Sequence, residues 1–424
     1  MTPMESRRDR SAFRIERDAL GKIEVPFDAL YGAQTARAIA NFPISGTKVS
    51  KFPGLLRALA NIKIAAARAN AVVGAIPGEK AGIIERVCEE IIAGQHHQHF
   101  PVDVFQGGAG TSTNMNMNEV IANRGLELMG LPCGAYEQLH PNDDVNRSQS
   151  TNDVYPTAIR MALMGDIPLL MERLLELASA FECKGEEFTG IAKLGRTELQ
   201  DAVPMTLGAE MRAYGVTIRE DVVRLRATVS MLGEINLGGT SIGTGVAAPD
   251  GYRTTAFAEL VALTGLQLTP AFDPLEASWD AGVFVHVSGV LKRVATKMSK
   301  VANDLRLLSS GPRGGFGEIR LPPMQPGSPI MPGKVNPVIC EMLNQVAFHV
   351  IGADVTISFA AEAGQLQLNA FEPIMAFELL QSIALLSNAA EIFRLRCVEG
   401  IEADAERCRR NLEASTANFA KGRP

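Results

Sequence analysis

Residues 283–308 read VFVHVSGVLKRVATKMSKVANDLRLL, and their apolar side chains recur in steps of three and four. This spacing predicts one long helix, because it gathers an apolar stripe on a single helical face. A glycine–proline pair at 311–312 ends the pattern. Such a helix is roughly 40 Å long at about 1.5 Å per residue. It therefore needs packing partners along its whole length to cover the stripe formed by Val283, Val287, Val290, Val294, Met298, Val301, Leu305 and Leu308.

Two other segments follow the same pattern. One runs from Leu207 to Leu232, and the other runs from Asp153 to Phe188, where Pro168 is expected to kink the helix. Long helices with continuous apolar stripes indicate an elongated multi-helix bundle that buries those stripes between subunits. We therefore predict a mainly α-helical protein.

The bulk composition is that of an ordinary soluble globular protein. The 424 residues are 46% hydrophobic and 21% charged, and this length predicts two or three domains. A net charge of −6 gives no electrostatic reason to bind nucleic acid or an anionic membrane. The six cysteines lack metal-binding spacing, the first 17 residues carry no signal peptide, and no apolar run has the length of a membrane span. We expect a cytoplasmic protein with reduced thiols.

Several glycine-rich polar loops lie between the helical segments. Residues 106–114 precede a helix expected to begin near Met115, and residues 148–153 precede the segment that starts at Asp153. Free N–H groups and hydroxyls at a helix N-terminus form a good anion site, although each loop taken alone could equally be an ordinary helix cap. Residues 238–245 look like a phosphate cradle, but they lack the strand context and the lysine of a nucleotide-binding loop.

The histidines offer little support for a metal site. His96, His97 and His99 are clustered, yet no nearby cysteine or acidic residue completes a ligand set. We therefore expect no metal and no other cofactor.

The loop at 327–337, GSPIMPGKVNP, combines two glycines and three prolines with a serine, a lysine and an asparagine. Glycine permits unusual backbone angles and proline fixes others, so the loop has a defined shape. Such a loop can bring a hydroxyl, an ammonium group and several backbone N–H groups around a small anion.

This loop resembles the signature G-S-x-x-M-x-x-K-x-N of the fumarase/aspartase superfamily, with every fixed position present. Four other segments match the family in the expected order, and the similarity extends from about Phe13 to about Cys408. These segments are 31–35 with 41–44, 110–116, 140–143 leading into 150–152, and 195–201.

The resemblance implies a fumarase/aspartase-like fold in three parts. We expect a smaller, mostly helical N-terminal domain at 1–147 and a long central helical bundle at 148–404. Residues 405–424 are then the remnant of a small C-terminal domain that is truncated. The resemblance also implies a homotetramer with composite active sites, in which the Thr111, Ser150 and Ser328 loops meet in trans.

The family's reaction is an anti elimination from a four-carbon dicarboxylate or a related succinyl compound. A base removes a proton next to one carboxylate, and the resulting enediolate dianion needs oriented donors. The resemblance assigns the base to Ser328, activated by Lys334 and backbone N–H groups, although a serine that merely caps the loop is the alternative. It assigns the remaining substrate contacts to Thr111, Asn142, Ser150, Thr151, Asn152, Thr197, Lys334 and Asn336.

Two positions depart from the family pattern. Pro329 stands where members commonly have a second serine, so one hydroxyl and one backbone N–H are lost. Glu198 stands where fumarases carry a histidine, and a carboxylate there would attract a substrate amine. The family also places Glu341 beside this position. Two adjacent carboxylates cannot both ionise easily, so we expect the Glu198–Glu341 pair to share a proton. A solvated Glu198 without a role is the alternative.

An amine leaving group fits these residues best. An ammonium group leaves as ammonia without further protonation, whereas expulsion of hydroxide needs a general acid. Residues 107–111, 142–146, 199–205 and 360–366 also look more like aspartase than fumarase. We predict an ammonia-lyase that converts L-aspartate to fumarate. The alternatives are a class II fumarase, a lyase acting on another aspartate-like amine, and a catalytically impaired helical scaffold.

Overall fold

The computed structural model describes residues 13–327, 331 and 334–415, and it divides the chain into two compact units. Unit 1 comprises the described residues within 1–165, 230–285 and 356–380. Unit 2 comprises those within 166–229, 286–355 and 381–424. Ser328 and Pro329 therefore lie outside the described residues.

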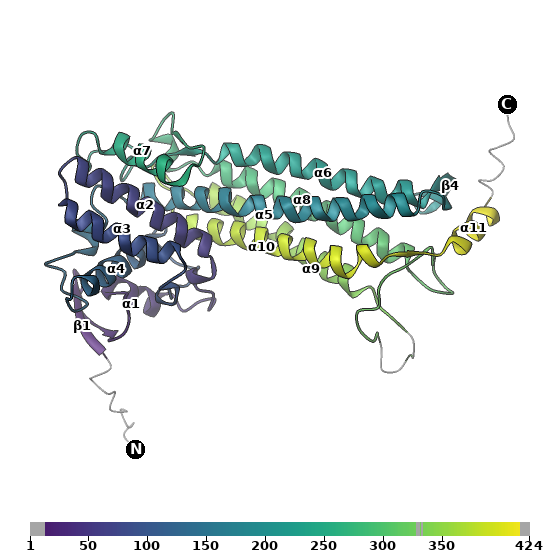
Figure 1. The fold of residues 1–424 in the computed structure, drawn as a ribbon, viewed down its shortest axis with the longest axis horizontal. Coiled ribbons are helices and arrows are strands. Elements are labelled where there is room, and N and C mark those ends of the chain that lie inside the picture. The colour runs from purple at the N-terminus through teal and green to yellow at the C-terminus, as the bar shows by residue number, and fades with distance from the viewer. Residues whose placement is uncertain (1–12, 328–330, 332–333, 416–424) are drawn as a thin grey trace, which may run out of the picture. The chain divides into compact units, whose positions relative to one another are not determined.

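Unit 1 is mainly helical. Its α2 packs against α3 and α7, and its α4 packs against α1 and α3 (Figure 1). Its α-helices are α1 (Ala33–Asn41), α2 (Pro53–Val72), α3 (Gly78–Ile92), α4 (Thr111–Leu128), α7 (Tyr252–Thr264) and the first part of α5 (Thr151–Glu187). Its strands are the antiparallel pair β1 (Phe13–Asp18) and β2 (Gly21–Pro26) and the parallel pair β5 (Glu234–Ile235) and β6 (Thr269–Pro270). Short turns complete it at Val49–Lys51, His97–His99, Pro141–Val145 and Glu276–Ser278.

The motif at 31–35 has a structural explanation. The backbone N–H groups at the start of α1 donate to two buried carboxylates: Gly32 N lies 2.8 Å from Glu119 Oε2, and Ala33 N lies 3.0 Å from Glu16 Oε2. These carboxylates satisfy N–H groups that a helix leaves free at its first turn. A Cβ atom at position 32 would lie 2.5 Å from Glu16 Oε2 and 2.6 Å from Tyr136 Oη, so a larger residue would displace these side chains.

Unit 2 is a bundle of long helices that run along one another (Figure 1). Tyr214 Oη donates to Asp304 across α6 and α8 at 2.9 Å, and Ser288 Oγ donates to Asp354 across α8 and α9 at 2.8 Å. The bundle contains parts of α5, α6 (Leu207–Met231), α8 (Gly282–Leu308), α9 (Val338–Glu362) and α10 (Glu372–Arg396).

The stripes that predicted these helices are largely buried. The expected helices at 207–232, 283–308 and 153–188 are confirmed within one or two residues at each end. Along α8 the buried set includes Val287, Val294, Met298, Val301, Leu305 and Leu308. Val283 and Val290 are only half-buried, and Phe284 and Leu291 take the core positions beside them.

A buried ionic cluster holds the end of unit 2 together. Glu318 is fully buried between Lys193 at 3.2 Å and Arg196 at 2.7 Å. Asn411 of α11 (Ala405–Ala414) donates to the same carboxylate at 3.0 Å, so α11 is anchored beside β3. The strands here are the hairpin β3 (Ala192–Thr197) and β4 (Gln200–Thr206) and the antiparallel pair β7 (Ile319–Arg320) and β8 (Glu402–Ala403). A short turn at Val398–Gly400 follows α10.

Helix α9 carries an apolar face that the single chain leaves exposed. Phe348, Val355 and Phe359 are 62%, 53% and 70% exposed. Among the described residues, α9 and α10 are long and apolar enough to cross a membrane, a property shared with core helices of soluble proteins. The exposed face of α9 has the composition of a packing surface.

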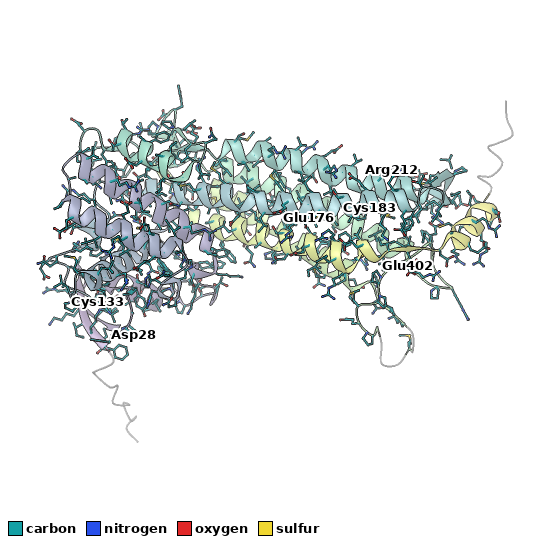
Figure 2. The ribbon with its side chains drawn as sticks, in the orientation of Figure 1. Asp28, Cys133, Glu176, Cys183, Arg212 and Glu402 are labelled. Atoms are coloured by element: carbon teal, nitrogen blue, oxygen red, sulfur yellow. The ribbon has the colours of Figure 1, made fainter. Side chains whose placement is uncertain are left out.

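A groove of about 860 Å³ lies on unit 2, along the second part of α5. Glu176 and Cys183, both labelled on α5 in Figure 2, line it. None of the predicted site residues borders this groove.

Candidate active site

The first turn of α4 carries Thr111 and follows three residues with positive φ. Gly108, Ala109 and Gly110 have φ of 87°, 54° and 87°. This sharp turn lets α4 begin at Thr111, so the expected start near Met115 is wrong by about one helical turn. A Cβ atom at position 110 would lie 2.5 Å from the ring of Tyr155, which also requires glycine at this position.

Thr111 is exposed at this helix start. Its backbone N and its Oγ1 both donate to Gly108 O, at 2.9 and 2.6 Å. Gln106 Oε1 accepts from Thr113 N at 3.0 Å and so satisfies one N–H group of the first turn. The positive end of α4 lies beside the exposed Thr111 hydroxyl, which favours an anion.

Ser150 directly precedes α5, whose first turn carries Thr151 and Asn152, and this segment lies next to the start of α4. Asn114 Nδ2 donates to Thr151 Oγ1 at 3.1 Å. The Thr111 and Ser150 segments thus lie side by side within one chain. Gly110 and Tyr155 pack α4 against α5 within the chain, and the expected meeting of the Thr111, Ser150 and Ser328 loops in trans stays a prediction.

The glycine-rich loop at 238–245 cradles a carboxylate of the chain itself. Gly238 N and Thr240 N each donate to Asp153 Oδ2 at 3.0 Å, while Asp153 Oδ1 accepts from Ser150 N at 3.0 Å. Asn152 Nδ2 also donates to Ser241 O at 2.8 Å. Asp153 therefore ties the Ser150 segment to this loop and explains the loop's likeness to a phosphate cradle. Burial raises the pKa of Asp153 to about 6, although these three N–H groups oppose the shift.

Lys63 on α2 is a residue that the sequence argument missed. It is fully buried, and its Nζ donates to Asn146 Oδ1 at 3.0 Å and to Gln149 Oε1 at 2.8 Å. Burial lowers the pKa of Lys63 to about 7, while the nearby charge of Asp153 opposes the shift. The available signal was a lysine inside an otherwise apolar run, Ile62-Lys63-Ile64.

Asn142 lies in the turn at Pro141–Val145, where it is exposed. His140 Nδ1 accepts hydrogen bonds from the backbone N–H groups of Asn142 and Asp143, at 3.1 and 3.0 Å. The histidine thus caps this turn, and the Asn142 side chain stays near the surface.

In unit 2, Thr197 and Glu198 lie at the tip of the β3–β4 hairpin. Thr197 pairs with Gln200 across the turn, and the two residues between them have positive φ: 52° for Glu198 and 62° for Leu199. Such a turn normally takes glycine or asparagine, so this tip is strained and presents an exposed carboxylate.

The described part of the signature loop closes on itself. Gly327 N donates to Lys334 O at 2.9 Å, and Asn336 Nδ2 donates to Gly327 O at 3.3 Å. Asn336 therefore has a structural bond besides its predicted substrate contact. Within the described ranges, no hydrogen bond or ion pair joins Glu198 to Glu341, and their pairing stays a prediction.

Among the residues that the structure describes, no group of three or more His, Cys, Asp or Glu side chains is placed to hold a metal ion. His96 instead lies 2.7 Å from the Glu90 carboxylate.

The chain matches known lyases over nearly its whole length. A family model described as Lyase matches residues 21–352. The aspartate ammonia-lyase of Pseudomonas aeruginosa is 55% identical over 403 residues, which are 95% of this chain and 85% of that protein. The aspartate ammonia-lyase of Escherichia coli K12 is 51% identical over 396 residues, which are 93% of this chain and 83% of that protein.

Solved structures show the same fold. The fumarate lyase:delta crystallin of Brucella melitensis bound to cobalt superposes with a TM-score of 0.93 at 54% identity, covering 95% of this chain and 88% of that one. The class II fumarase of Schistosoma mansoni superposes with a TM-score of 0.92 at 34% identity, covering 96% of this chain and 88% of that one.

Proposed function

The chain belongs to the fumarase/aspartase superfamily of lyases, and from that premise we propose how it eliminates ammonia from L-aspartate to give fumarate. It is a carbon–nitrogen lyase. The observation that carries the choice of substrate is its 55% identity to an aspartate ammonia-lyase, against 34% to a class II fumarase.

The starts of α4 and α5 form the donor set for the enediolate intermediate. When the base removes the proton, one substrate carboxylate must accept a second negative charge. Ser150 and Thr151 stabilise that charge with hydroxyls at the start of α5, and Thr111 joins them once its hydroxyl turns from Gly108 O toward the substrate. Support comes from the bond between Asn114 Nδ2 and Thr151 Oγ1. This bond fixes the position of the Thr151 oxygen, and the hydroxyl's own hydrogen is the donor that we assign to the substrate carboxylate.

In this proposal the signature loop at 327–337 supplies the base and the residues that bind the other substrate carboxylate. Ser328 removes the proton, and the positive charge of Lys334 favours its alkoxide form. Lys334 and Asn336 hold the second carboxylate, with Asn142, Asn152 and Thr197 completing the pocket. Glu198 attracts the substrate ammonium group, which departs as ammonia when the carbon–nitrogen bond breaks.

Formation of fumarate tests this function directly. The purified protein is offered L-aspartate and then malate, and fumarate is followed by its ultraviolet absorbance. We expect turnover of L-aspartate. Turnover of malate alone would make the protein a fumarase, and absence of both would make it an inactive scaffold.

We also propose that the protein is a cytoplasmic homotetramer whose active sites are built by loops from three subunits. The exposed apolar face of α9 supports assembly, because another copy of the chain would cover Phe348, Val355 and Phe359. The six cysteines are all free thiols, which suits a reducing compartment. Sedimentation should show a tetramer, and a stable folded monomer would contradict the composite sites.

A further inference from the structure

A buried lysine, Lys63, donates hydrogen bonds to the residues that precede Ser150. Lys63 of α2 donates to the side chains of Asn146 and Gln149 at 3.0 and 2.8 Å, just before Ser150. Burying an ammonium group among apolar side chains costs free energy, which only its hydrogen bonds and nearby charges can offset. A methionine would fill a similar volume without that cost, so packing alone does not explain the lysine.

Helix α2 also binds Arg147 and Ser148, which lie between Asn146 and Gln149 in the sequence. Asn70, seven residues after Lys63, donates to Arg147 O at 2.8 Å and accepts from Ser148 Oγ at 2.6 Å. Ser148 has φ of 61°, a conformation that needs such support. Each residue from Asn146 to Gln149 is therefore bound by α2.

The contact with Asn146 connects Lys63 to the proposed donor set. Asn146 Oδ1 accepts from Lys63 Nζ, from Asn114 Nδ2 at 3.1 Å and from Asn118 Nδ2 at 3.1 Å. Asn114 Nδ2 donates in turn to Thr151 Oγ1 at 3.1 Å. The Asn114 side-chain amide therefore donates both of its hydrogens, one to Asn146 and one to Thr151. The orientation of this amide depends on the position of the Asn146 oxygen.

We propose that Lys63 is a positioning residue for the elimination, which acts through Asn146 and Asn114 to direct the Thr151 hydroxyl hydrogen toward the substrate carboxylate. This inference rests on the proposed function and adds a residue that lies outside the loops assigned to substrate. The Lys63 Nζ can donate to both side chains whether it is charged or neutral, and hydrogen bonds in a water-poor interior are stronger than in water. Asp153 fixes the same segment through Ser150 N, so the segment is held from both ends.

Steady-state kinetics with L-aspartate test the proposal. Lys63→Met should lower kcat by about 10- to 100-fold and change KM less than about threefold, because a misdirected donor weakens mainly the transition state. Lys63→Gln, whose amide can donate to the same oxygens, should recover part of the lost kcat.

A second variant covers the case in which Lys63→Met does not fold. Asn146→Ala cuts the connection at a half-buried side chain and leaves Lys63 in place. It should lower kcat by about 10-fold with little change in KM. A kcat within twofold of wild type in either folded variant would overturn the proposal.

A matched control separates positioning from general destabilisation. Asn123 is a fully buried side chain of α4 that donates to Leu30 O and accepts from Gly134 N, each at 2.8 Å. Asn123→Leu should lower the melting temperature and leave kcat unchanged. An equal loss of kcat in Asn123→Leu would also overturn the proposal. A wild-type chain that forms no fumarate would refute the proposed function itself, and this inference with it.

Discussion

Asp153 and Lys63 are both fully buried, and burial moves their pKa values in opposite directions. The pKa of Asp153 rises from 3.8 to about 6, so the folded protein keeps a proton that the unfolded chain loses in this range. Its contribution to stability is therefore present below the lower value and is lost as pH rises through about 6. The pKa of Lys63 falls from 10.5 to about 7, so its contribution is present at high pH and is lost as pH falls through about 7.

The Lys63 shift predicts a pH-dependent stability difference. Relative to Lys63→Met, the wild-type free energy of unfolding should rise with pH from about 7 upward, by at most about 1.4 kcal/mol per pH unit. Chemical unfolding of both proteins at pH 7 to 9.5 and one protein concentration would measure it. Parallel curves would mean that Lys63 keeps an ordinary pKa in the folded protein.

If Ser328 is the catalytic base, removing its hydroxyl should affect the turnover rate but not the affinity for substrate. Ser328→Ala should abolish turnover while substrate binding survives, because Lys334 and Asn336 still hold the carboxylate. Lys334→Ala should impair both. Losses of several kcal/mol in activation free energy are reasonable for a positioned catalytic group. Rates and calorimetric binding would measure the split, and a near-normal rate in Ser328→Ala would exclude it as the base.

Among the elements, the β3–β4 hairpin places Glu198 at a strained, exposed tip. If Glu198 shares a proton with Glu341, Glu198→Gln should retain substantial lyase activity but shift its pH profile. The profile of kcat against pH would measure this. An unchanged profile would favour a solvated glutamate, whereas malate turnover gained in Glu198→His would support its role in choosing the leaving group.

Helix boundaries show what the sequence can predict. The stripes of α6 and α8 located both helices, because a long apolar face has to be buried wherever the helix lies. The start of α4 was misplaced because Ala109 adopts a positive φ between two glycines, and alanine carries no local signal for that conformation.

The sequence predicted residues of the candidate site but not the packing and the buried lysine that position them. The resemblance identified Thr111 and Ser150, whereas the position of the start of α4 beside α5 depends on Gly110 packing against Tyr155, some 45 residues apart in sequence. The sequence does not predict the burial of Lys63, because a single lysine on a helix normally faces solvent. Its burial follows from tertiary packing, which local patterns do not report.

For the whole molecule, the exposed face of α9 is the feature that a monomer leaves unexplained. Phe348, Val355 and Phe359 are spaced by seven and four residues, so they share one helical face. Burying each large apolar side chain contributes about 1.5–3 kcal/mol, and this favours association of several such faces. The stripes of α6 and α8 are already largely buried within one chain, so the face of α9 is the surface that the proposed neighbouring subunits would cover.

Val355→Asp should therefore prevent assembly, because it places a charge in the contact face and burial of an unpaired carboxylate is costly. Sedimentation velocity should show smaller species than the tetramer proposed for the wild type, and lyase activity should fall with them if the active sites are built from several subunits as proposed. Leu20→Asp is the matched control, since Leu20 is exposed at the turn between β1 and β2 and should tolerate the charge. If Val355→Asp stayed tetrameric, the α9 face would not be the contact. If it became a fully active monomer, the sites would be complete within one chain.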